Sequence, residues 1–482
     1  MSYLFFAIFL SISVRTLGWH LQCWQLQEYR FDRMKVWLDT NEGTKNLFNL
    51  WFFPGILPRP KISARIFIIL AAFAGLLFLA CWHIPAEIWS LIFSDNLYIF
   101  SALLIAERTI FLFIFFAVLC SKFPVWIQKK ILFSRAKAII QSAKNTTVIG
   151  ITGSYGKSST KTILAHLLTE NFGPKAVLFN PENDNNEVAI ARLILSQKPF
   201  FASEQRNFFV VEMGAYSRGE IATMCDFVQP DFGLLTGLGN QHLPLFGSAE
   251  NIRLAKRELY DATKTKLFYA GKGWGDFLVT PAEKVDLSNA EIKECGTDFL
   301  DFSYQNHSFH LPWGGEFFLS NALLAIKMGC ELGIVIEKIS ADLSTLPPLK
   351  KALRVETHRG GGPLLIDLYS ANLNGVLGAI NHLQRVTSGQ KIVIAMPLRE
   401  LGNEAESAHG VYFSALKKID ARVLWYKKDF ENLGNDILGE QFFCTNSETE
   451  LIQAAKKISL QKNDGVLLES RLPERLVDVF YP

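Results

Sequence analysis

The sequence predicts an α/β protein in three parts: N-terminal transmembrane helices, a central domain with a mostly parallel sheet, and a C-terminal Rossmann-like domain. Three observations support this. Long apolar runs are confined to the N-terminal quarter, a strand breaks into a glycine-rich turn near residue 150, and β-type and helix-type segments alternate from there onward. We place the domain boundaries at 1–140, 141–346 and 347–482.

Three apolar runs are candidate membrane spans. Ile66 to Trp82 carries no charge and, with its flanks, reaches the roughly 20 residues that a helix needs to cross a bilayer. Leu97 to Cys120 is equally apolar but holds a Glu-Arg pair, which must face other helices or a polar cavity. Tyr3 to Trp24 lacks the basic start of a signal peptide and is expected to be an anchor. The alternative is a buried helical domain of a soluble protein.

Basic residues predict the orientation of these spans. None lies between His83 and Leu97, whereas several lie between the first two spans and after the third. The positive-inside rule then places the C-terminal domains in the cytosol of a multi-pass protein of the cytoplasmic membrane. We also expect the basic loop to contact anionic lipids of the bilayer. The basic residues are Arg30, Arg33, Lys35, Lys45, Arg59, Lys61, Arg65, Lys122, Lys129, Lys130, Arg135 and Lys137.

Net charge and cysteine spacing argue against a nucleic-acid-binding protein, a cysteine metal site and a disulfide framework. The net charge of +3 gives no reason to expect nucleic acid as a partner, and the seven cysteines show no C-x-x-C pair that would indicate a metal site or a disulfide framework. The oligomeric state is not indicated.

The glycine-rich turn reads VIGITGSYGKSST from Val148 to Thr160 and predicts a phosphate-binding loop, as in ATPases. Glycines let backbone N–H groups surround phosphate oxygens, the lysine meets the β/γ charge, and a hydroxyl holds Mg²⁺. A helix is expected from Ser159 to Leu168. The alternative is a plain turn with a solvated lysine. The residues assigned to ATP are Thr152, Gly153, Ser154, Tyr155, Gly156, Lys157, Ser158 and Ser159.

Buried parallel strands are predicted on both sides of Leu346-Pro347-Pro348. They are Thr147–Thr152, Phe208–Met213 and Phe232–Thr236 in the central domain, and Leu364–Asp367, Lys391–Met396, Arg422–Tyr426 and Gly465–Leu468 in the C-terminal domain.

Polar residues follow the central strands at the sheet edge where α/β proteins bind ligands. They are the run Asn183-Asp-Asn-Asn186 and Glu212, and Glu212 is a candidate Mg²⁺ ligand. Taken alone, an asparagine-rich run is more often a surface loop, and a glutamate at the end of a strand is more often a solvated carboxylate. Their order after a phosphate-binding loop favours a site.

At this point the chain resembles the Mur ligase family, and within it the branch that joins D-alanyl-D-alanine to a muramyl tripeptide. The resemblance covers roughly Val148 to Arg471. Five motifs in register carry it: TGSYGKSS (152–159), NDNNE (183–187), EMGA-x-x-x-GEI (212–221), HL-x-x-FGS (242–248) and AKREL (255–259).

The resemblance implies an ATP-dependent amide ligase of peptidoglycan precursor synthesis. A substrate carboxylate attacks the γ-phosphate of ATP, and an amine converts the acyl phosphate to an amide. By resemblance, Lys157 contacts the phosphates, Ser158 and Glu212 hold one Mg²⁺, and His242 and a carbamylated Lys256 serve a second. Taken singly, His242 is more often structural and Lys256 a solvated helix lysine.

Further roles rest on the same resemblance. Asn321, Arg354 and Asp367 are assigned to the nucleotide, although Arg354 and Asp367 are also consistent with a domain-interface ion pair. The residues assigned to substrate are Asn183, Asn185, Asn186, Tyr369, Asn372, Ser470 and Arg471.

The chain departs from the family pattern at several positions. Phe317-Phe318 replace an H-N pair, Ile366 and Pro397 replace aspartates, and Glu469 replaces a glycine, so the adenine contacts and the amine pocket are altered.

The predicted spans also stand where the family has a UDP-sugar-binding domain. We therefore hypothesise a lipid-linked muramyl acceptor, whose confinement to the bilayer raises its effective concentration. The alternatives are a ligase for another envelope substrate and a membrane scaffold that binds nucleotide without turnover.

Overall fold

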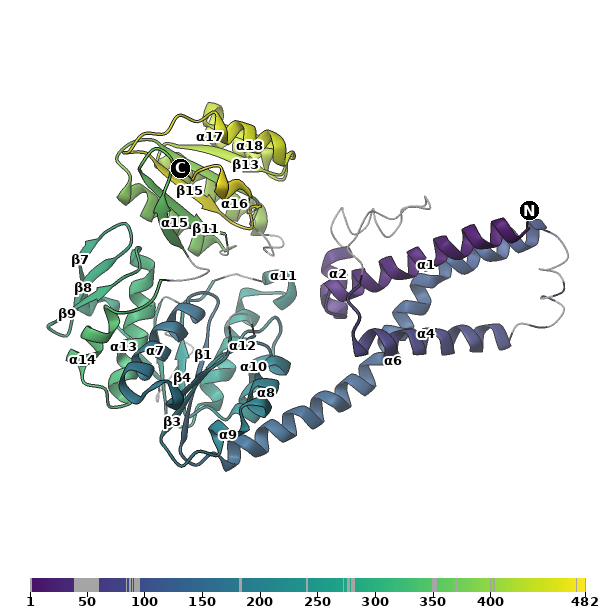
Figure 1. The fold of residues 1–482 in the computed structure, drawn as a ribbon, viewed down its shortest axis with the longest axis horizontal. Coiled ribbons are helices and arrows are strands. Elements are labelled where there is room, and N and C mark those ends of the chain that lie inside the picture. Colours follow the sequence, from purple (N-terminus) through teal and green to yellow (C-terminus); the bar gives the residue numbers. More distant parts are fainter. Residues whose placement is uncertain are drawn as a thin grey trace. The chain divides into compact units, whose positions relative to one another are not determined.

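The chain divides into two compact units, Met1–Leu132 and Phe133–Pro482 (Figure 1). The computed structural model describes residues 2–38, 60–83, 85, 88, 90, 96–181, 184–239, 242–271, 273–274, 278, 282–348, 353–368, 372–398, 401, 404–473 and 475–481. Each unit is described by itself below.

Helices form the first unit. They are α1 (Ser2–Leu26), α2 (Phe31–Leu38), α4 (Ala64–Trp82) and α6 (Asn96–Ser142), and each of the three predicted spans lies inside one of the long helices. Trp24, Ile69 and Ile114 pack together in the core of this unit.

The prediction of a multi-pass protein is not supported by the described residues. One segment there, Leu112–Ser142 of α6, is long and apolar enough to cross a membrane, and Ala64–Leu79 of α4 is shorter. The predicted span Leu97–Cys120 lies inside helix α6, which extends beyond the span. The helix continues through Pro124 and has 47 residues.

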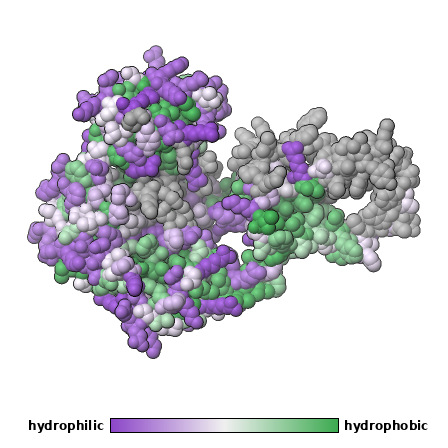
Figure 2. All heavy atoms as spheres, in the orientation of Figure 1, coloured by the Kyte–Doolittle hydropathy of each residue, from purple (hydrophilic) through white to green (hydrophobic). Residues whose placement is uncertain are grey.

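Helices α4 and α6 turn large apolar side chains outward. Phe67, Phe78 and Trp82 of α4 are 62%, 62% and 72% exposed, and Phe116 of α6 is 50% exposed. Figure 2 shows hydrophobic atoms gathered over these two helices. Contiguous apolar surface of this kind marks a contact with lipid or with another protein.

The central sheet has six parallel strands in the order β2-β3-β1-β4-β5-β6. This confirms the predicted mostly parallel sheet and sets β1, which carries the glycine-rich turn, between β3 and β4. The strands are β1 (Thr146–Thr152), β2 (Val177–Phe179), β3 (Asn207–Glu212), β4 (Phe232–Leu235), β5 (Lys266–Tyr269) and β6 (Ala282–Lys284). The helices of this region are α7 (Lys157–Phe172), α8 (Glu187–Ser196), α9 (Lys198–Phe201), α10 (Glu220–Val228), α11 (Leu243–Phe246) and α12 (Ala249–Ala262).

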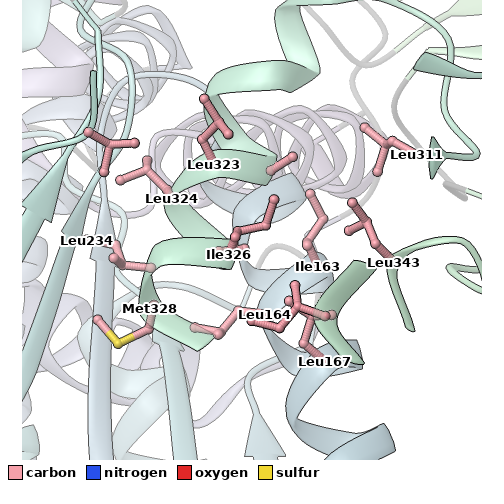
Figure 3. Close-up of a cluster of buried hydrophobic side chains, with 14 of the residues drawn as sticks. Ile163, Leu164, Leu167, Leu234, Leu311, Leu323, Leu324, Ile326, Met328 and Leu343 are labelled. Atoms are coloured by element: carbon pink, nitrogen blue, oxygen red, sulfur yellow. The ribbon is translucent and has the colours of Figure 1, made fainter. Parts of the chain in front are cut away.

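Helix α7 packs against α13 (Leu319–Glu331) and α14 (Ile336–Leu343). Its residues Ile163, Leu164 and Leu167 are fully buried and lie beside Leu323 of α13 (Figure 3). A three-stranded antiparallel sheet, β7 (Ala290–Cys295), β8 (Leu300–Tyr304) and β9 (His307–Leu311), closes this core. Helix α7 follows the glycine-rich turn directly. Because its buried face packs against α13 and α14, the C-terminal end of the turn is held in place.

The C-terminal sheet is mixed, with order β10-β11-β15-β12-β13-β14, and β10 is the antiparallel edge strand. Its strands are β10 (Arg354–Thr357), β11 (Pro363–Asp367), β12 (Lys391–Ala395), β13 (Ala421–Tyr426), β14 (Phe442–Thr445) and β15 (Gly465–Glu469). Helices α15 (Leu373–Val386), α16 (Ala405–Lys418), α17 (Glu431–Leu438), α18 (Glu448–Lys456) and α19 (Arg475–Asp478) accompany them. All four strands predicted in this part are present.

Candidate active site

The glycine-rich turn joins β1 to α7 in a geometry that requires glycine. Gly156 has φ 84° and caps the first turn of α7, and a Cβ at this position would stand 2.4 Å from Asn321 Oδ1. A side chain there would therefore be strained and would clash. The contact also shows that Asn321, predicted to bind nucleotide, lies against the turn.

Hydrogen bonds attach the turn to the residues that follow β4. Ser154 N donates to Gly237 O at 2.8 Å, and Thr236 Oγ1 donates to Tyr155 O at 2.6 Å. Thr152 Oγ1 donates to Met213 O at 2.8 Å, on the other side of β1. The turn is thus held at the carboxyl edge of three neighbouring strands, where ligands bind in such sheets.

Glu212, at the end of β3, is the centre of a buried polar cluster. Its side chain is 2% exposed and accepts hydrogen bonds from Ser158 Oγ at 2.9 Å and Asn185 Nδ2 at 3.0 Å. Lys161 Nζ lies 3.0 Å from the same carboxylate. Three residues predicted from separate motifs, Ser158, Asn185 and Glu212, therefore meet at one place.

Sequence reasoning missed two members of this cluster. Lys161 lies one turn beyond Lys157 on α7, is 2% exposed, and also donates to Asn180 O at 2.9 Å. Asn180 accepts from Glu212 N at 2.8 Å and is fully buried. The spacing of four between the two lysines, which places both on one helix face, was the available signal for Lys161. Asn180 had none.

Burial and charge act against each other at Glu212 and Lys157. Burial raises the pKa of Glu212, but Lys161, Lys157 and the bond from Asn185 outweigh it, so the net pKa is lowered and the group stays ionised. Burial lowers the pKa of Lys157, and Glu212 opposes that shift. Lys157 Nζ donates to Gly153 O at 2.8 Å and to Ser154 O at 3.2 Å.

A small cavity of about 60 Å³ lies beside Lys157 and collects further predicted residues. His242 and Lys256 line it together with Gly153, Ser154 and Asn185. His242 has φ 62° at the start of α11, and its ring meets the Tyr216 ring edge-on at 4.7 Å. Three of the four residues predicted to be catalytic, Lys157, His242 and Lys256, therefore line one space, and the fourth, Glu212, reaches its lining through Asn185.

Lys256 is unusual among the lysines of this site. It projects from α12, is 4% exposed, and its Nζ lies 5.8 Å from the centre of the Phe246 ring. Burial, reinforced by the charge of Lys157, lowers its pKa to about 7. A large share of this amine is therefore neutral near pH 7, and only a neutral amine can add to CO₂ to form a carbamate.

The substrate residues assigned from the asparagine motifs have capping roles in the fold. Asn186 Oδ1 accepts from Val188 N and Ala189 N and caps α8, and Asn372 Oδ1 accepts from Gly375 N and caps α15. Asn372 also lines a cavity of about 290 Å³ with Ser154 and Tyr155 of the turn. Asn183 and Tyr369 lie outside the described residues.

The remaining C-terminal residues lie on or beside β10, β11 and β15. Arg354 is exposed and its Nε is 3.2 Å from Glu356 Oε1. Asp367 is 4% exposed and its carbonyl accepts from Ser470 N at 3.0 Å. Arg471 follows at the surface. No ATP contact for these four residues follows from the geometry, so their assignments stay predictions.

Two departures from the family pattern are accommodated by packing. Phe318 is 2% exposed in the core beneath the central sheet, and Phe317 lines a separate cavity of about 590 Å³ with Cys295, His382 and Arg385. Glu469 is fully buried and pairs in register with Asp367 on the neighbouring strand. Burial, with Asp367 adding to it, raises the pKa of Glu469 well above its ordinary value, although the hydroxyl of Tyr412 donates to it.

The donor set at the turn fits Mg²⁺ in part. Ser158 Oγ and Glu212 Oε2 are oxygens 2.9 Å apart, the ligand type that Mg²⁺ prefers. Within the described ranges, no three His, Cys, Asp or Glu side chains form a metal-binding group. An ion here would therefore take its other ligands from phosphate and water, which is usual for Mg²⁺.

Comparison with known proteins agrees with this geometry. Residues 151–329 match the Mur ligase middle domain. UDP-N-acetylmuramoyl-tripeptide--D-alanyl-D-alanine ligase of Bacillus subtilis is 29% identical over 366 residues, which are 71% of this chain and 77% of that protein.

Two solved structures share the fold. MurF from Acinetobacter baumannii has a TM-score of 0.63 at 20% identity and covers 73% of this chain and 80% of its own. MurF from Thermotoga maritima in complex with ADP has a TM-score of 0.62 at 22% identity, covering 73% and 83%.

We predict that Lys256 is reactive as an amine near neutral pH. Its rate of acetylation by acetic anhydride, followed by peptide mass spectrometry, should rise to half its maximum near pH 7, because the neutral fraction follows its pKa of about 7. In urea-unfolded protein the half-rise should move toward about 10.4, the value for a free lysine. Equal pH dependence in both states would contradict the buried position.

We predict that Glu469→Gln stabilises the protein increasingly as pH rises. The folded state holds the Glu469 proton more tightly than the unfolded state, so wild-type stability falls once pH exceeds the ordinary value of about 4.3. The melting temperature of the variant minus that of wild type should grow from pH 5 to pH 8. Glu440→Gln, at an exposed glutamate, is the control and should give a difference independent of pH.

Proposed function

We propose that the chain is an ATP-dependent amide ligase of the Mur ligase type and that it joins D-alanyl-D-alanine, or a related amine, to a muramyl peptide in peptidoglycan precursor synthesis. The name of the Bacillus subtilis relative supports this choice of substrates. We propose further that the enzyme works at a membrane surface.

The observation that carries the proposal is the convergence of two side chains on the Glu212 carboxylate beneath the glycine-rich turn. Ser158 Oγ lies 2.9 Å and Lys161 Nζ 3.0 Å from this carboxylate. Backbone N–H groups at the start of α7 and the ammonium of Lys157 supply positive charge to phosphate oxygens there. The cavity of His242 and Lys256 adjoins the same turn. Anion binding and a reaction space therefore lie side by side.

The proposed chemistry brings two anions together. The acceptor carboxylate attacks the γ-phosphorus of ATP, and the bond between this phosphorus and the oxygen that bridges to the β-phosphate breaks. ADP departs, and the acceptor now carries an acyl phosphate. The amine then attacks the carbonyl carbon, inorganic phosphate leaves, and the amine nitrogen loses a proton to solvent or a neighbouring base. Lys157 offsets the phosphate charge and orients the γ-group, which is the main demand in such a transfer.

We propose that Ser158 and Glu212 hold Mg²⁺ and that His242 and carbamylated Lys256 serve a second ion. Bound Mg²⁺ would supply Lewis-acid charge to the phosphate oxygens. For Lys256, burial and Lys157 keep the amine partly neutral, which is the condition for carbamate formation. Lys161 is proposed to hold Glu212 in place.

A second candidate is a ligase for another envelope substrate. The buried Glu469 beside Asp367 favours it, because a carboxyl side chain in place of glycine changes the shape and the hydrogen-bonding groups at the carboxyl ends of β11 and β15. In this candidate function the phosphoryl transfer is the same as in the first, and the amine that is joined is not D-alanyl-D-alanine.

We propose that α6 attaches the enzyme to the bilayer and that the acceptor is lipid-linked. The apolar segment of α6 and the exposed Phe67, Phe78 and Trp82 of α4 support the attachment. An acceptor held in the same bilayer would meet the site at raised effective concentration.

We predict that Lys157→Ala lowers ATP turnover on the order of a hundredfold or more, because a charge aimed at the transferring phosphoryl group is lost. Phosphate release by protein purified in mild detergent measures it. Lys175→Ala, at an exposed lysine beyond the end of α7, is the matched control and should leave turnover unchanged. Turnover that survives in the Lys157 variant would refute the assignment of the turn.

The substrate proposal is tested with two acceptors, lipid-linked and UDP-linked muramyl tripeptide, each offered with D-alanyl-D-alanine, ATP and Mg²⁺. We expect amide product, identified by mass, from the lipid-linked acceptor. Product from the UDP-linked acceptor alone would reject the lipid-linked substrate and keep the ligase. Turnover with neither, but with another amine, would favour the second candidate.

A further inference from the structure

Two cations of the N-terminal unit are held on aromatic rings that come from another part of the chain. The Arg65 guanidinium, at the start of α4, lies 4.4 Å from the centre of the Tyr29 ring. Lys122 Nζ, in α6, lies 4.0 Å from the centre of the Phe31 ring. The turn between α1 and α2 thus gathers positive charge from two distant helices. We call Tyr29, Phe31, Arg65 and Lys122 the collar.

The collar cations differ from two nearby arginines, Arg30 and Arg33. Arg30 is paired with Asp32 at 2.7 Å and Arg33 with Glu28 at 2.8 Å, so carboxylates already offset their charge. Within the part of the chain that the structure describes, Arg65 and Lys122 contact rings, and Arg65 Nε is buried without a hydrogen-bond partner. An aromatic face attracts a cation but accepts none of its conventional hydrogen bonds, so their donors stay available.

The surroundings of Lys122 have the composition of a membrane interface. Phe123 and Trp126 are 67% and 56% exposed, and their rings stack at 6.3 Å. Lys130 Nζ lies 5.1 Å from the centre of the Trp126 ring. The sequence has no acidic residue between Glu107 and Glu170. The predicted span Leu97–Cys120 ends two residues before Lys122, and aromatic and basic residues at the end of such a span are typical of the headgroup level of a bilayer.

We propose that the collar binds the phosphate headgroup of an anionic phospholipid, with Arg65 and Lys122 as its donors. The proposal rests on the membrane attachment of the chain proposed above. Charge complementarity commits it to an anionic lipid, because these two cations have no carboxylate partner among the described residues and α6 adds aromatic side chains and no acids beside them. A guanidinium and an ammonium are each hydrogen-bond donors that the oxygens of a phosphodiester accept.

The test uses the full chain in nanodiscs of phosphatidylcholine mixed with phosphatidylglycerol. Protein extracted with mild detergent is analysed for retained lipid by mass spectrometry. Wild type should retain phosphatidylglycerol over phosphatidylcholine, and Arg65→Gln and Lys122→Gln should each lower that preference roughly fivefold. Lys144→Gln, an exposed lysine in the second unit, should not change it.

Further measurements distinguish a lipid site from a soluble-anion site and from loss of folding. Arg65→Lys keeps the charge and should retain most of the preference, which guards against a variant that only misfolds. Added inorganic phosphate should not displace the lipid, and displacement would reassign the site to a soluble anion. Equal retention of both lipids by wild type would overturn the proposal. Protein that does not enter nanodiscs at all would instead refute the membrane attachment.

Discussion

The candidate site depends on one buried carboxylate. Glu212 joins β3 to the glycine-rich turn through Ser158, to α7 through Lys161, and to the asparagine loop through Asn185. Removing one partner of such a buried pair typically costs about 3–5 kcal/mol, because the other charge is left uncompensated in a dry environment. The same contacts that hold the turn therefore place an acidic oxygen next to the hydroxyl of Ser158. The stability of this region and the anion binding that we propose for it depend on the same contacts.

Much of the central architecture could be predicted from the sequence. Buried strands such as β1 and β3 are continuous apolar runs, and Gly156 indicates a backbone that other residues rarely adopt. Asn180 was missed because its position beside Glu212 comes from the pairing of β2 with β3, which no local pattern encodes. For Lys161 the only local signal was its spacing of four from Lys157. The antiparallel strands β7 to β9 were missed as well. They are short and alternate between buried and exposed residues, so they lack the apolar runs that marked the parallel strands.

The C-terminal part shows how a changed motif can persist in an intact fold. Phe318 is buried in the central core, and Glu469 has a hydroxyl partner in Tyr412, so neither departure leaves an open gap. Such accommodation explains why fold was easier to infer than substrate. Packing tolerates many side chains of suitable volume, whereas recognition of a particular amine depends on a few polar atoms.

Asn372 shows that folding and recognition can be separated within one side chain. Its oxygen is committed to the backbone at the start of α15, which leaves only its amide nitrogen for anything in the adjoining cavity. An aspartate would cap the helix equally well, yet it would present an acceptor where a donor now stands. An aspartate in place of Asn372 would thus exchange a hydrogen-bond donor for an acceptor in the wall of this cavity, and it would leave the cap of α15 intact.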